Sequence, residues 1–285
     1  MPNTSKAPQT SDSHSVLAIL AGGDPLPTTI AQVAVAKGWG VHVVTFAGQP
    51  KPTSLPNVNS VKEFPLGQIG HILAHLKAHK VTHVALAGHL NKPSILSLKP
   101  DATGLKLLAR AVIKHDDALL RSVTDFLQEE GFKLVTIQDL APSLLAPKGL
   151  LTKAEPTADE VEDIALARST LAVLGDLDIG QACIVHNGAI IGVEAVEGTD
   201  ALITRCAALR MGPNGNGEQG GILVKRAKDM QTDLADLPTV GLETLNLLAK
   251  FNYRGLHIQS GRTLFLNQPE TIAHANAHNL FVVSE

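Results

Sequence analysis

The chain has 285 residues, of which 44% are hydrophobic and 18% are charged, and its formal net charge at pH 7 is −3. This composition is typical of a globular protein and not of a disordered one. The slightly acidic balance and the 3% content of aromatic residues argue against nucleic-acid binding, which uses basic surfaces or aromatic stacking platforms.

The two cysteines, Cys183 and Cys206, have neither metal-ligand spacing nor the pattern of a disulfide framework. They indicate a reducing compartment, so a cytoplasmic location is expected. Residues 1–14 are rich in Ser, Thr and Pro and are expected to form a disordered tail, not a signal peptide. No apolar run approaches the length of a membrane span.

An N-terminal domain is predicted over residues 15–145, where apolar segments alternate with helix-like segments. The expected strands are Val16–Ala21, Val41–Phe46, Thr82–Ala87 and Lys133–Ile137, and the expected helices are Thr28–Lys37, Ile69–Lys80, a helix from Leu105, and Asp117–Glu130. Strands that alternate with helices predict a parallel sheet with right-handed crossovers. The sequence therefore predicts an α/β fold whose N-terminal domain is Rossmann-like.

Gly22 and Gly23 follow the first expected strand, as in the opening of a nucleotide-binding βαβ unit. A full G-x-G-x-x-G pattern is absent, however, and the second strand ends in Thr45-Phe46-Ala47-Gly48. That ending lacks the acidic residue that would hold an adenosine ribose. A dinucleotide-dependent redox enzyme is therefore disfavoured.

Gly88, His89 and Lys92 follow the third expected strand, and Asp101 lies farther along the same connection. Open α/β sheets bind ligands beyond the carboxyl ends of their strands, so this connection should border the crevice. His89 and Lys92 are candidates for contact with a phosphate or a base. An ordinary polar loop with helix caps is the alternative.

His71, His75 and His79 recur every four residues on one expected helix. This spacing can bind a transition metal. The buried face of the helix is instead expected to consist of Ile and Leu side chains, and no acidic or Cys ligand lies nearby in the sequence. The pattern favours a solvated surface.

The stretch 146–156 is rich in Pro, Leu and Lys and is predicted to connect the two domains. The C-terminal domain, 157–285, should open with a helix over Thr157–Leu174, with Thr157 and Glu160 as a capping box. Asn187-Gly188 predicts a hairpin between Cys183–His186 and Ala189–Val196. A mixed α/β domain with an antiparallel element is therefore expected.

The second strand of that hairpin runs into Glu197, Gly198, Thr199 and Asp200, and a helix is expected over Ala201–Leu209. Thr199 or Asp200 could cap the helix. Because helix N-termini attract anions, the two acids are either caps or ligands for a cation held near a phosphate.

A polar loop, Lys225–Gly241, leaves the apolar strand Gly221–Val224, and a helix is expected to begin near Pro238. Loops at strand ends carry much of the chemistry of α/β proteins.

Short motifs spread in order through nearly all of the chain after the tail resemble those of one known family. They are Ala21-Gly22-Gly23 with Leu26-Pro27; Ala87-Gly88 with Pro93; Pro100-Asp101 with Gly104-Leu105-Lys106-Leu107-Leu108; Asp116-Asp117-Ala118-Leu119-Leu120-Arg121; Leu177-Asp178-Ile179-Gly180-Gln181; Val193-Glu194-Ala195; Glu197-Gly198-Thr199-Asp200; Leu223-Val224-Lys225; and Asp236-Leu237-Pro238-Thr239-Val240-Gly241. As an ordered set they resemble the LpxI type of UDP-2,3-diacylglucosamine pyrophosphatase, an enzyme of lipid A synthesis.

The resemblance implies magnesium-dependent hydrolysis of UDP-2,3-diacylglucosamine to UMP and 2,3-diacylglucosamine 1-phosphate (lipid X). It also implies a homodimer whose two domains enclose the UDP-linked diacylated glucosamine lipid. A lipid with two acyl chains implies peripheral contact with the inner membrane. The family's critical acidic residue lies in an Asp-Leu-Pro motif that falls on Asp236.

Such a reaction needs charge neutralisation at the pyrophosphate and an oriented water. Asp236 and Asp200 are the candidates for magnesium ligand or base, with Lys225 to offset phosphate charge and Glu197 as a helper. The expected substrate-binding residues are Gly22, Gly23, Gly88, His89, Lys92, Asp101, Glu197, Gly198 and Thr199. Helix capping is the alternative role for both aspartates.

The chain departs from the family pattern at a few positions. Asp24 stands where a third glycine is usual, Lys92 and Leu234 stand where arginine is common, and His89 and Thr103 are also atypical. Loss of arginine from an anion site is not conservative. A second hypothesis therefore stays open: a non-catalytic nucleotide or phosphosugar binding protein of the same fold.

Overall fold

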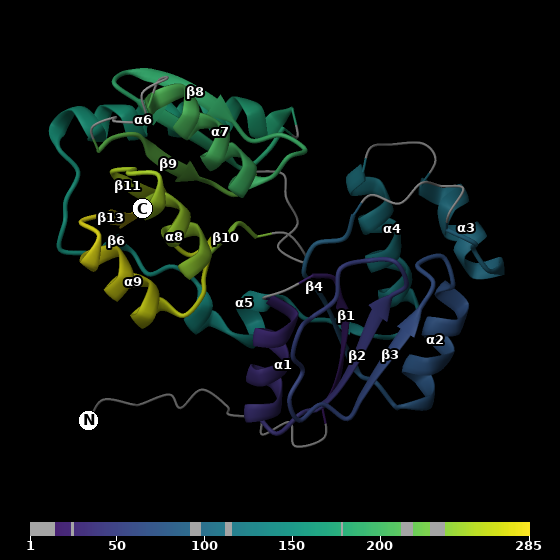
Figure 1. The fold of residues 1–285 in the computed structure, drawn as a ribbon. Helices are drawn as coiled ribbons and strands as arrows, with labels where there is room; N and C mark the ends of the chain where they lie inside the picture. The colour runs from purple at the N-terminus through teal and green to yellow at the C-terminus, as the bar shows by residue number, and fades with distance from the viewer. Residues whose placement is uncertain are drawn as a thin grey trace, which may run out of the picture. The chain divides into compact units, whose positions relative to one another are not determined.

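The computed structural model describes residues 15–23, 26–91, 98–111, 116–177, 179–211, 219–228 and 237–285. The chain divides into two compact units, Met1–Ala141 and Pro142–Glu285, and each is described by itself (Figure 1). The predicted tail, residues 1–14, lies outside the described residues.

The first unit is built on a five-stranded parallel sheet in the order β3-β2-β1-β4-β5. Its strands are β1 (Val16–Ala21), β2 (Gly40–Phe46), β3 (Ser60–Phe64), β4 (His83–Ala87) and β5 (Lys133–Leu134). The order reverses between β1 and β4, as in doubly wound nucleotide-binding folds, and the crevice of such folds lies at this point. The predicted parallel sheet is confirmed.

The helices of the first unit are α1 (Leu26–Ala36), α2 (Ile69–Ala78), α3 (Ala102–Ala111), α4 (Asp116–Glu129) and α5 (Ile137–Leu140). Ile72 and Leu76 of α2 pack with buried residues of β1, β2 and β4 in one core cluster. His71 and His75 of α2, and His79 directly after it, lie beside this apolar face. His71 and His79 are exposed as expected, whereas His75 is half-buried and its ring centroid lies 5.4 Å from that of Phe64.

Two elements of the first unit differ from the sequence-based expectation. Strand β5 ends at Leu134 because Thr136 and Asp139 form a capping box that draws Ile137 into α5. Strand β3 was not predicted, and its central residues Val61, Lys62 and Glu63 are exposed. An edge strand without a buried face gives little hydrophobic signal.

The second unit contains a six-stranded mixed sheet in the order β6-β13-β11-β9-β7-β8. Its strands are β6 (Gly149–Leu150), β7 (Ala182–His186), β8 (Ala189–Val193), β9 (Ile222–Lys225), β11 (Gly255–Ile258) and β13 (Phe281–Ser284). Strands β9, β11 and β13 are parallel, whereas β6, β7 and β8 each pair antiparallel with a neighbour. The predicted hairpin and the mixed α/β architecture are confirmed.

Helices cover both faces of this sheet (Figure 1). They are α6 (Ala158–Asp176), α7 (Thr199–Met211), α8 (Leu242–Lys250) and α9 (Gln268–Ala277), with a short 3-10 turn η2 (Pro142–Leu144) before them. Alternation decides the contacts of β7: Cys183 and Val185 pack with α6, and Ile184 packs with α7 and α8. Thr157 and Glu160 form the predicted capping box.

The two cysteines of the chain are both inside the second unit. Cys183 lies in the cluster that contains α6, and Cys206 lies in the cluster that contains α7 and α8. Both thiols are free and buried. Burial raises the pKa of Cys183 to about 12 and also raises the pKa of Cys206.

Three expectations for the second unit are wrong in detail. The stretch 146–156 is not a free connection, because Gly149–Leu150 forms β6 and pairs with β13. Strand β8 ends at Val193, before Val196. The expected helix near Pro238 is instead strand β10 (Thr239–Val240), which pairs with β12 (Leu264–Phe265), and α8 begins only at Leu242.

In the part of the chain that the structure describes, no helix combines the length and the apolar character needed to cross a bilayer.

His257 on β11 is a buried titratable side chain that faces the α6 side of the sheet, and it is only 3% exposed. Its Nε2 lies 3.7 Å from a Glu285 carboxylate oxygen, beyond hydrogen-bond distance. Burial, assisted by the positive charge of Arg168 and opposed by Glu285, lowers the pKa of His257 from 6.5 to about 4. The folded protein therefore holds this ring neutral at mildly acidic pH, where the unfolded chain binds a proton.

We predict that His257 makes the second unit lose stability as the pH falls from 6.5 to about 4. In this window the unfolded state binds more protons than the folded state, so acid favours unfolding. His257→Leu should remove this contribution of His257 to the pH dependence of the free energy of unfolding. The contribution amounts to about 1–3 kcal/mol over the whole window. Urea unfolding followed by near-UV circular dichroism of Tyr253, the single tyrosine of the chain, measures it. An identical pH dependence in both proteins would contradict the assignment.

Candidate functional site

Lys225, the last residue of β9, is a lysine whose side chain is buried in the second unit and only 7% exposed. Its Nζ donates hydrogen bonds to Thr199 Oγ1 at 2.9 Å and to the carbonyl oxygen of Thr239 at 3.2 Å. A buried ammonium is costly unless its donors are satisfied and its charge is compensated. The position of Lys225 therefore requires a polar environment built for it.

Glu194, which follows β8 directly, supplies part of that environment. Its Oε1 accepts the Thr199 hydroxyl proton at 2.7 Å, and its Oε2 accepts the backbone N–H of Gln181 at 2.9 Å. Glu194, Thr199, Lys225 and the Thr239 carbonyl thus form one hydrogen-bonded series, which we call the Lys225 cluster.

Strand register brings the Lys225 cluster together. Ala182 pairs with Lys225, and Cys183 pairs with Val193. The first residues of β7 and the last residues of β8 and β9 therefore lie at the same end of the sheet's strands. Gly180 allows the close approach, because a Cβ atom there would lie 2.0 Å from the carbonyl oxygen of Glu194. Residues far apart in sequence converge for reasons of sheet geometry.

The turn between β8 and α7 contains the other predicted residues of this region. Gly198 has φ +81° and precedes α7, whose first residue is Thr199, so neither Thr199 nor Asp200 occupies the capping position. Glu197 is bound by Arg205 at 2.8 Å and by the backbone N–H of Ala195 at 3.1 Å. The hydrogen bond from Arg205 lowers the pKa of Glu197.

The structure therefore brings Thr199 to Lys225 but directs Glu197 toward Arg205. Asp200 is exposed in the first turn of α7. Asp236 and Lys92 lie outside the described residues, as do Asp24 and Leu234. Over the described ranges, no group of three or more His, Cys, Asp and Glu side chains is arranged to hold a metal ion.

In the first unit, the glycines after β1 and β4 pack against each other. Gly22 N–H donates to the Ala87 carbonyl at 2.8 Å, and Gly23 N–H donates to the His89 carbonyl at 2.9 Å. A Cβ atom on Gly22 would lie 2.2 Å from the His89 oxygen, and one on Gly88, where φ is +80°, would lie 2.3 Å from the Gly23 oxygen. Contact between two loops is thus sufficient to explain glycine at these positions.

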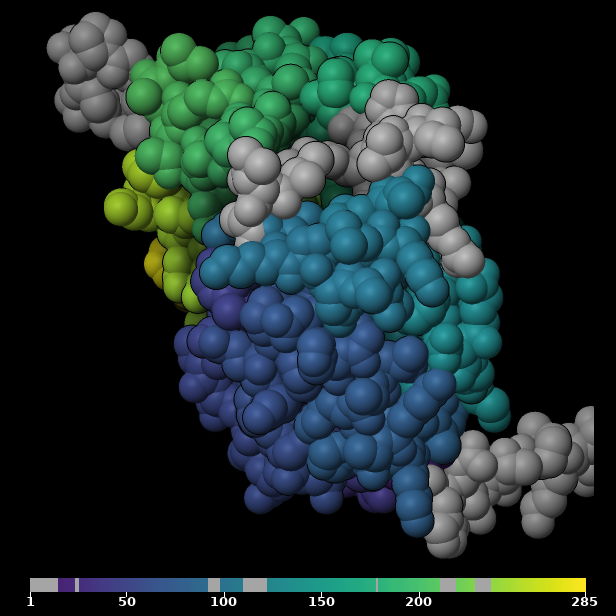
Figure 2. Space-filling view, turned by 90° about the vertical axis from the view of Figure 1, so that its right-hand side faces the viewer, coloured from purple at the N-terminus to yellow at the C-terminus, as the bar shows by residue number. Residues whose placement is uncertain are grey.

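Asp101 serves as a cap for both α2 and α3. The region that contains these two helices is blue in Figure 2. Its Oδ1 accepts from Gly104 N–H in α3 at 2.8 Å, and its Oδ2 accepts from Gly70 and His71 N–H in α2 at 2.8 and 3.3 Å. Burial would raise the pKa of this carboxyl group, but the backbone hydrogen bonds outweigh burial and lower the pKa. The carboxylate is held by helix ends before any ligand binds.

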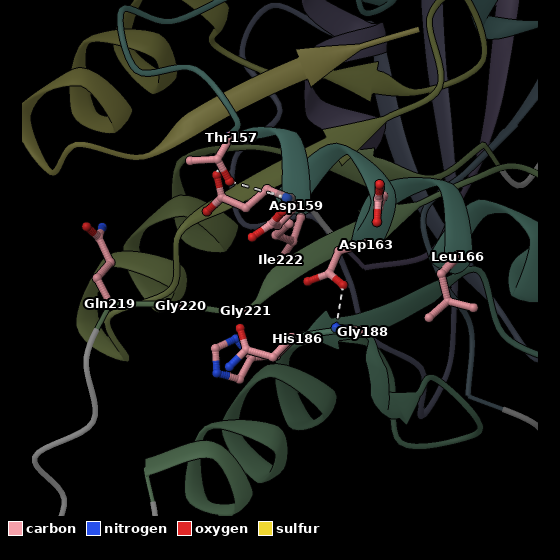
Figure 3. A pocket seen from close by; sticks show the side chains of 13 residues that line it. Thr157, Asp159, Asp163, Leu166, His186, Gly188, Gln219, Gly220, Gly221 and Ile222 are labelled. Atoms are coloured by element: carbon pink, nitrogen blue, oxygen red, sulfur yellow. Dashed lines mark hydrogen bonds between the residues drawn. The ribbon is translucent and has the colours of Figure 1, made fainter.

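A cavity of about 690 Å³ lies in the second unit between the N-terminus of α6, the β7–β8 turn and the start of β9 (Figure 3). Four of its lining residues are acidic: Asp159, Glu160, Glu162 and Asp163. Strand register puts it at the opposite end of β7 and β9 from Lys225. Carboxylates repel phosphate, so this cavity does not suit a nucleotide.

The sequence matches the LpxI N-terminal domain over residues 16–144 and the LpxI C-terminal domain over residues 147–283. The chain belongs to the LpxI family. It is 34% identical over 276 residues to UDP-2,3-diacylglucosamine pyrophosphatase LpxI of Caulobacter vibrioides, with 94% of this chain and 96% of that protein covered. Among solved structures, CobK precorrin-6A reductase aligns over 95% of this chain and 87% of its own, with 11% identity and a TM-score of 0.34.

For a member of the LpxI family, the residue that sequence reasoning missed is Glu194. If the strand continued to Val196, as the sequence predicts, alternation would put Glu194 on the face opposite Val193 and Ala195. The strand stops at Val193, so Glu194 is free to turn toward Thr199. Its presence in the Val193-Glu194-Ala195 motif of the family was the available signal.

We predict that Asp101→Ala lowers the stability of the first unit by about 1–3 kcal/mol, because two helix N-termini lose their acceptor. Asp125→Ala, which removes an exposed acid from α4, is the matched control and should have little effect. Urea unfolding followed by fluorescence of Trp39, the single tryptophan of the chain, measures both. Unchanged stability with weakened binding of UMP would support a ligand contact instead.

Proposed function

We propose that this chain is a hydrolase that cleaves the pyrophosphate of UDP-2,3-diacylglucosamine in lipid A synthesis, with UMP and 2,3-diacylglucosamine 1-phosphate as products and magnesium as cofactor. One observation carries the proposal: the relative that bears the name of this pyrophosphatase is 34% identical over 94% of this chain and 96% of its own length. A match that includes both domains and nearly all of each chain favours a shared activity over the sharing of a single domain.

The Lys225 cluster supports the proposal chemically. Cleavage of a pyrophosphate develops negative charge on phosphate oxygens, and a fixed cation in a water-poor site stabilises that charge. Lys225 supplies a buried ammonium at a strand end. Thr239, whose carbonyl Lys225 contacts, follows Asp236 by three residues of chain, which span at most about 11 Å.

Magnesium takes oxygen ligands, keeps several waters and often needs only one or two carboxylates from the protein. The exposed carboxylate of Asp200 in the first turn of α7 fits one of them, and Asp236 is the proposed second. When bound, the ion would neutralise charge on the pyrophosphate. Glu194 and Glu197 suit this role less, because their oxygens already accept protein hydrogen bonds.

We extend the proposal to the cellular setting. A substrate with two acyl chains stays at a membrane, so the protein would work in the cytoplasm in peripheral contact with the inner membrane, and we expect it to act as a homodimer.

We predict that wild-type protein releases UMP from UDP-2,3-diacylglucosamine only with magnesium, and that Asp236→Ala lowers the rate by at least about 100-fold. Asp159→Ala, in the acidic cavity at the other end of the sheet, is the control and should retain activity. Chromatographic detection of UMP, with and without EDTA, measures all three proteins.

Failure of folded wild-type protein to release UMP would refute the proposed reaction. If UMP then still raised the melting temperature of the protein, the alternative of a non-catalytic nucleotide-binding protein would replace it. Equal activity of Asp236→Ala and wild type would leave the reaction in place and remove Asp236 from its central role.

A further inference from the structure

We propose that Glu194 is a positioning residue that acts through the Thr199 hydroxyl to hold the buried Lys225 ammonium charged and fixed in direction. The inference rests on the proposed function, in which Lys225 offsets phosphate charge, and deepens it by assigning a role to Glu194. Glu194 is not expected to touch the substrate.

The direction of the hydrogen bonds supports this assignment. A carboxylate only accepts, so the single proton of the Thr199 hydroxyl must point to Glu194 Oε1, at 2.7 Å. The lone pairs of Thr199 Oγ1 are then left for Lys225 Nζ, at 2.9 Å. A negative charge on Glu194 thus fixes Thr199 as an acceptor toward the lysine.

Glu194 is itself fixed from a second side. Its Oε2 accepts the backbone N–H of Gln181 at 2.9 Å, in the segment that leads into β7. A carboxylate held at both oxygens keeps one orientation, and such outer contacts orient the groups that perform the chemistry.

The far end of the cluster is Thr239, a near neighbour in sequence of the proposed catalytic acid. Lys225 Nζ donates to the carbonyl of Thr239 in β10, where the chain emerges from the Asp236-Leu237-Pro238 motif. Glu194 therefore acts at the start of a series that runs through Thr199 and Lys225 to the carbonyl of Thr239, which follows Asp236 by three residues in the sequence.

The Lys225 cluster is not explained by a contribution to the stability of the folded protein. A buried lysine costs free energy, and an apolar side chain of similar volume is often as stabilising or more so. A hydroxyl and a carbonyl that accept from one ammonium, with a carboxylate behind the hydroxyl, are explained by a need for a fixed positive charge.

Four ionisable side chains on the described elements α7 and α8 and in the turn before α7 are paired with each other or exposed, and a fifth is a buried thiol. Glu197 and Arg205 bind each other, and Asp200 of α7 and Glu243 of α8 are exposed. Cys206 of α7 is buried, and the pKa of its thiol is raised by burial. On β11, Ile258 pairs with Lys225, and His257 faces the α6 side.

The test compares Glu194→Gln, which keeps the shape of the side chain but loses its charge, with wild type. We expect kcat to fall about 10–100-fold, the range typical of outer-sphere positioning residues. KM should change little, because the charge is needed most in the transition state. The alkaline limb of the kcat profile should move to lower pH, because a lysine that loses a nearby negative charge deprotonates more readily.

Thr199→Val and Thr199→Ser form the second comparison. Valine removes the hydroxyl that links Glu194 to Lys225, so its kcat should fall as in Glu194→Gln, whereas serine keeps the hydroxyl and should restore most of the rate. Thr204→Val removes a hydroxyl from the same helix, where it binds only the Asp200 carbonyl, and should behave as wild type. Glu162→Gln removes an exposed charge and is the control for Glu194→Gln.

Failure of this inference can be separated from failure of the proposed reaction. If wild type turns over and Glu194→Gln matches Glu162→Gln in kcat and pH profile, the positioning role is refuted and the reaction stands. The pKa of Lys225, measured by NMR of lysine labelled at Nζ and assigned with Lys225→Arg, needs no substrate. A lower pKa in Glu194→Gln supports the role even if UMP release fails, and an unchanged pKa overturns it.

Discussion

The cost of burying a positive charge at the end of β9 constrains the segments of the second unit that lie around it. The ammonium of Lys225 has to be met by oxygen atoms, and these come from the start of α7 and from β10. Each of these segments is in turn fixed by ordinary backbone geometry: α7 by the glycine turn before it, and β10 by its pairing with β12. The turn before α7 and the pairing of β10 thus place oxygen atoms where the Lys225 ammonium needs them.

The first unit shows how an apparent ligand motif can have a packing origin. Consecutive glycines after a buried strand are commonly associated with phosphate binding. Here Gly22 and Gly88 let two loops touch backbone to backbone at the point where the strand order reverses. Asp101 is similar, because a carboxylate in the expected crevice is engaged by the N-termini of α2 and α3. Binding by these residues remains a prediction with a competing physical explanation.

Much of the fold follows from hydrophobic periodicity and turn chemistry. The buried strand Val16–Ala21, the capping box of Thr157 and the Asn187-Gly188 hairpin are local signals, and the structure has each of them. Hydrophobic periodicity does not predict strands β3 and β10. Strand β3 is an exposed edge strand, and β10 consists of two residues that pair with β12, far along the chain.

The candidate site was only partly visible in the sequence. Thr199 and Lys225 lie in sequence motifs that already predict site residues. Glu194 joins them only because β8 stops three residues before Val196, a boundary that sheet pairing decides and periodicity does not. Sequence reasoning found the residues at the ends of elements, and the three-dimensional register determined which of them meet.

The burial of both native thiols has a practical consequence for spectroscopy. Cys183 and Cys206 are the chain's two cysteines, and both are enclosed in the core of the second unit, where burial keeps them protonated and unreactive. A cysteine introduced on the surface would be the fast-reacting thiol in the native protein. Spin labels or fluorophores could therefore be attached to either unit of the folded protein without replacing the natural cysteines.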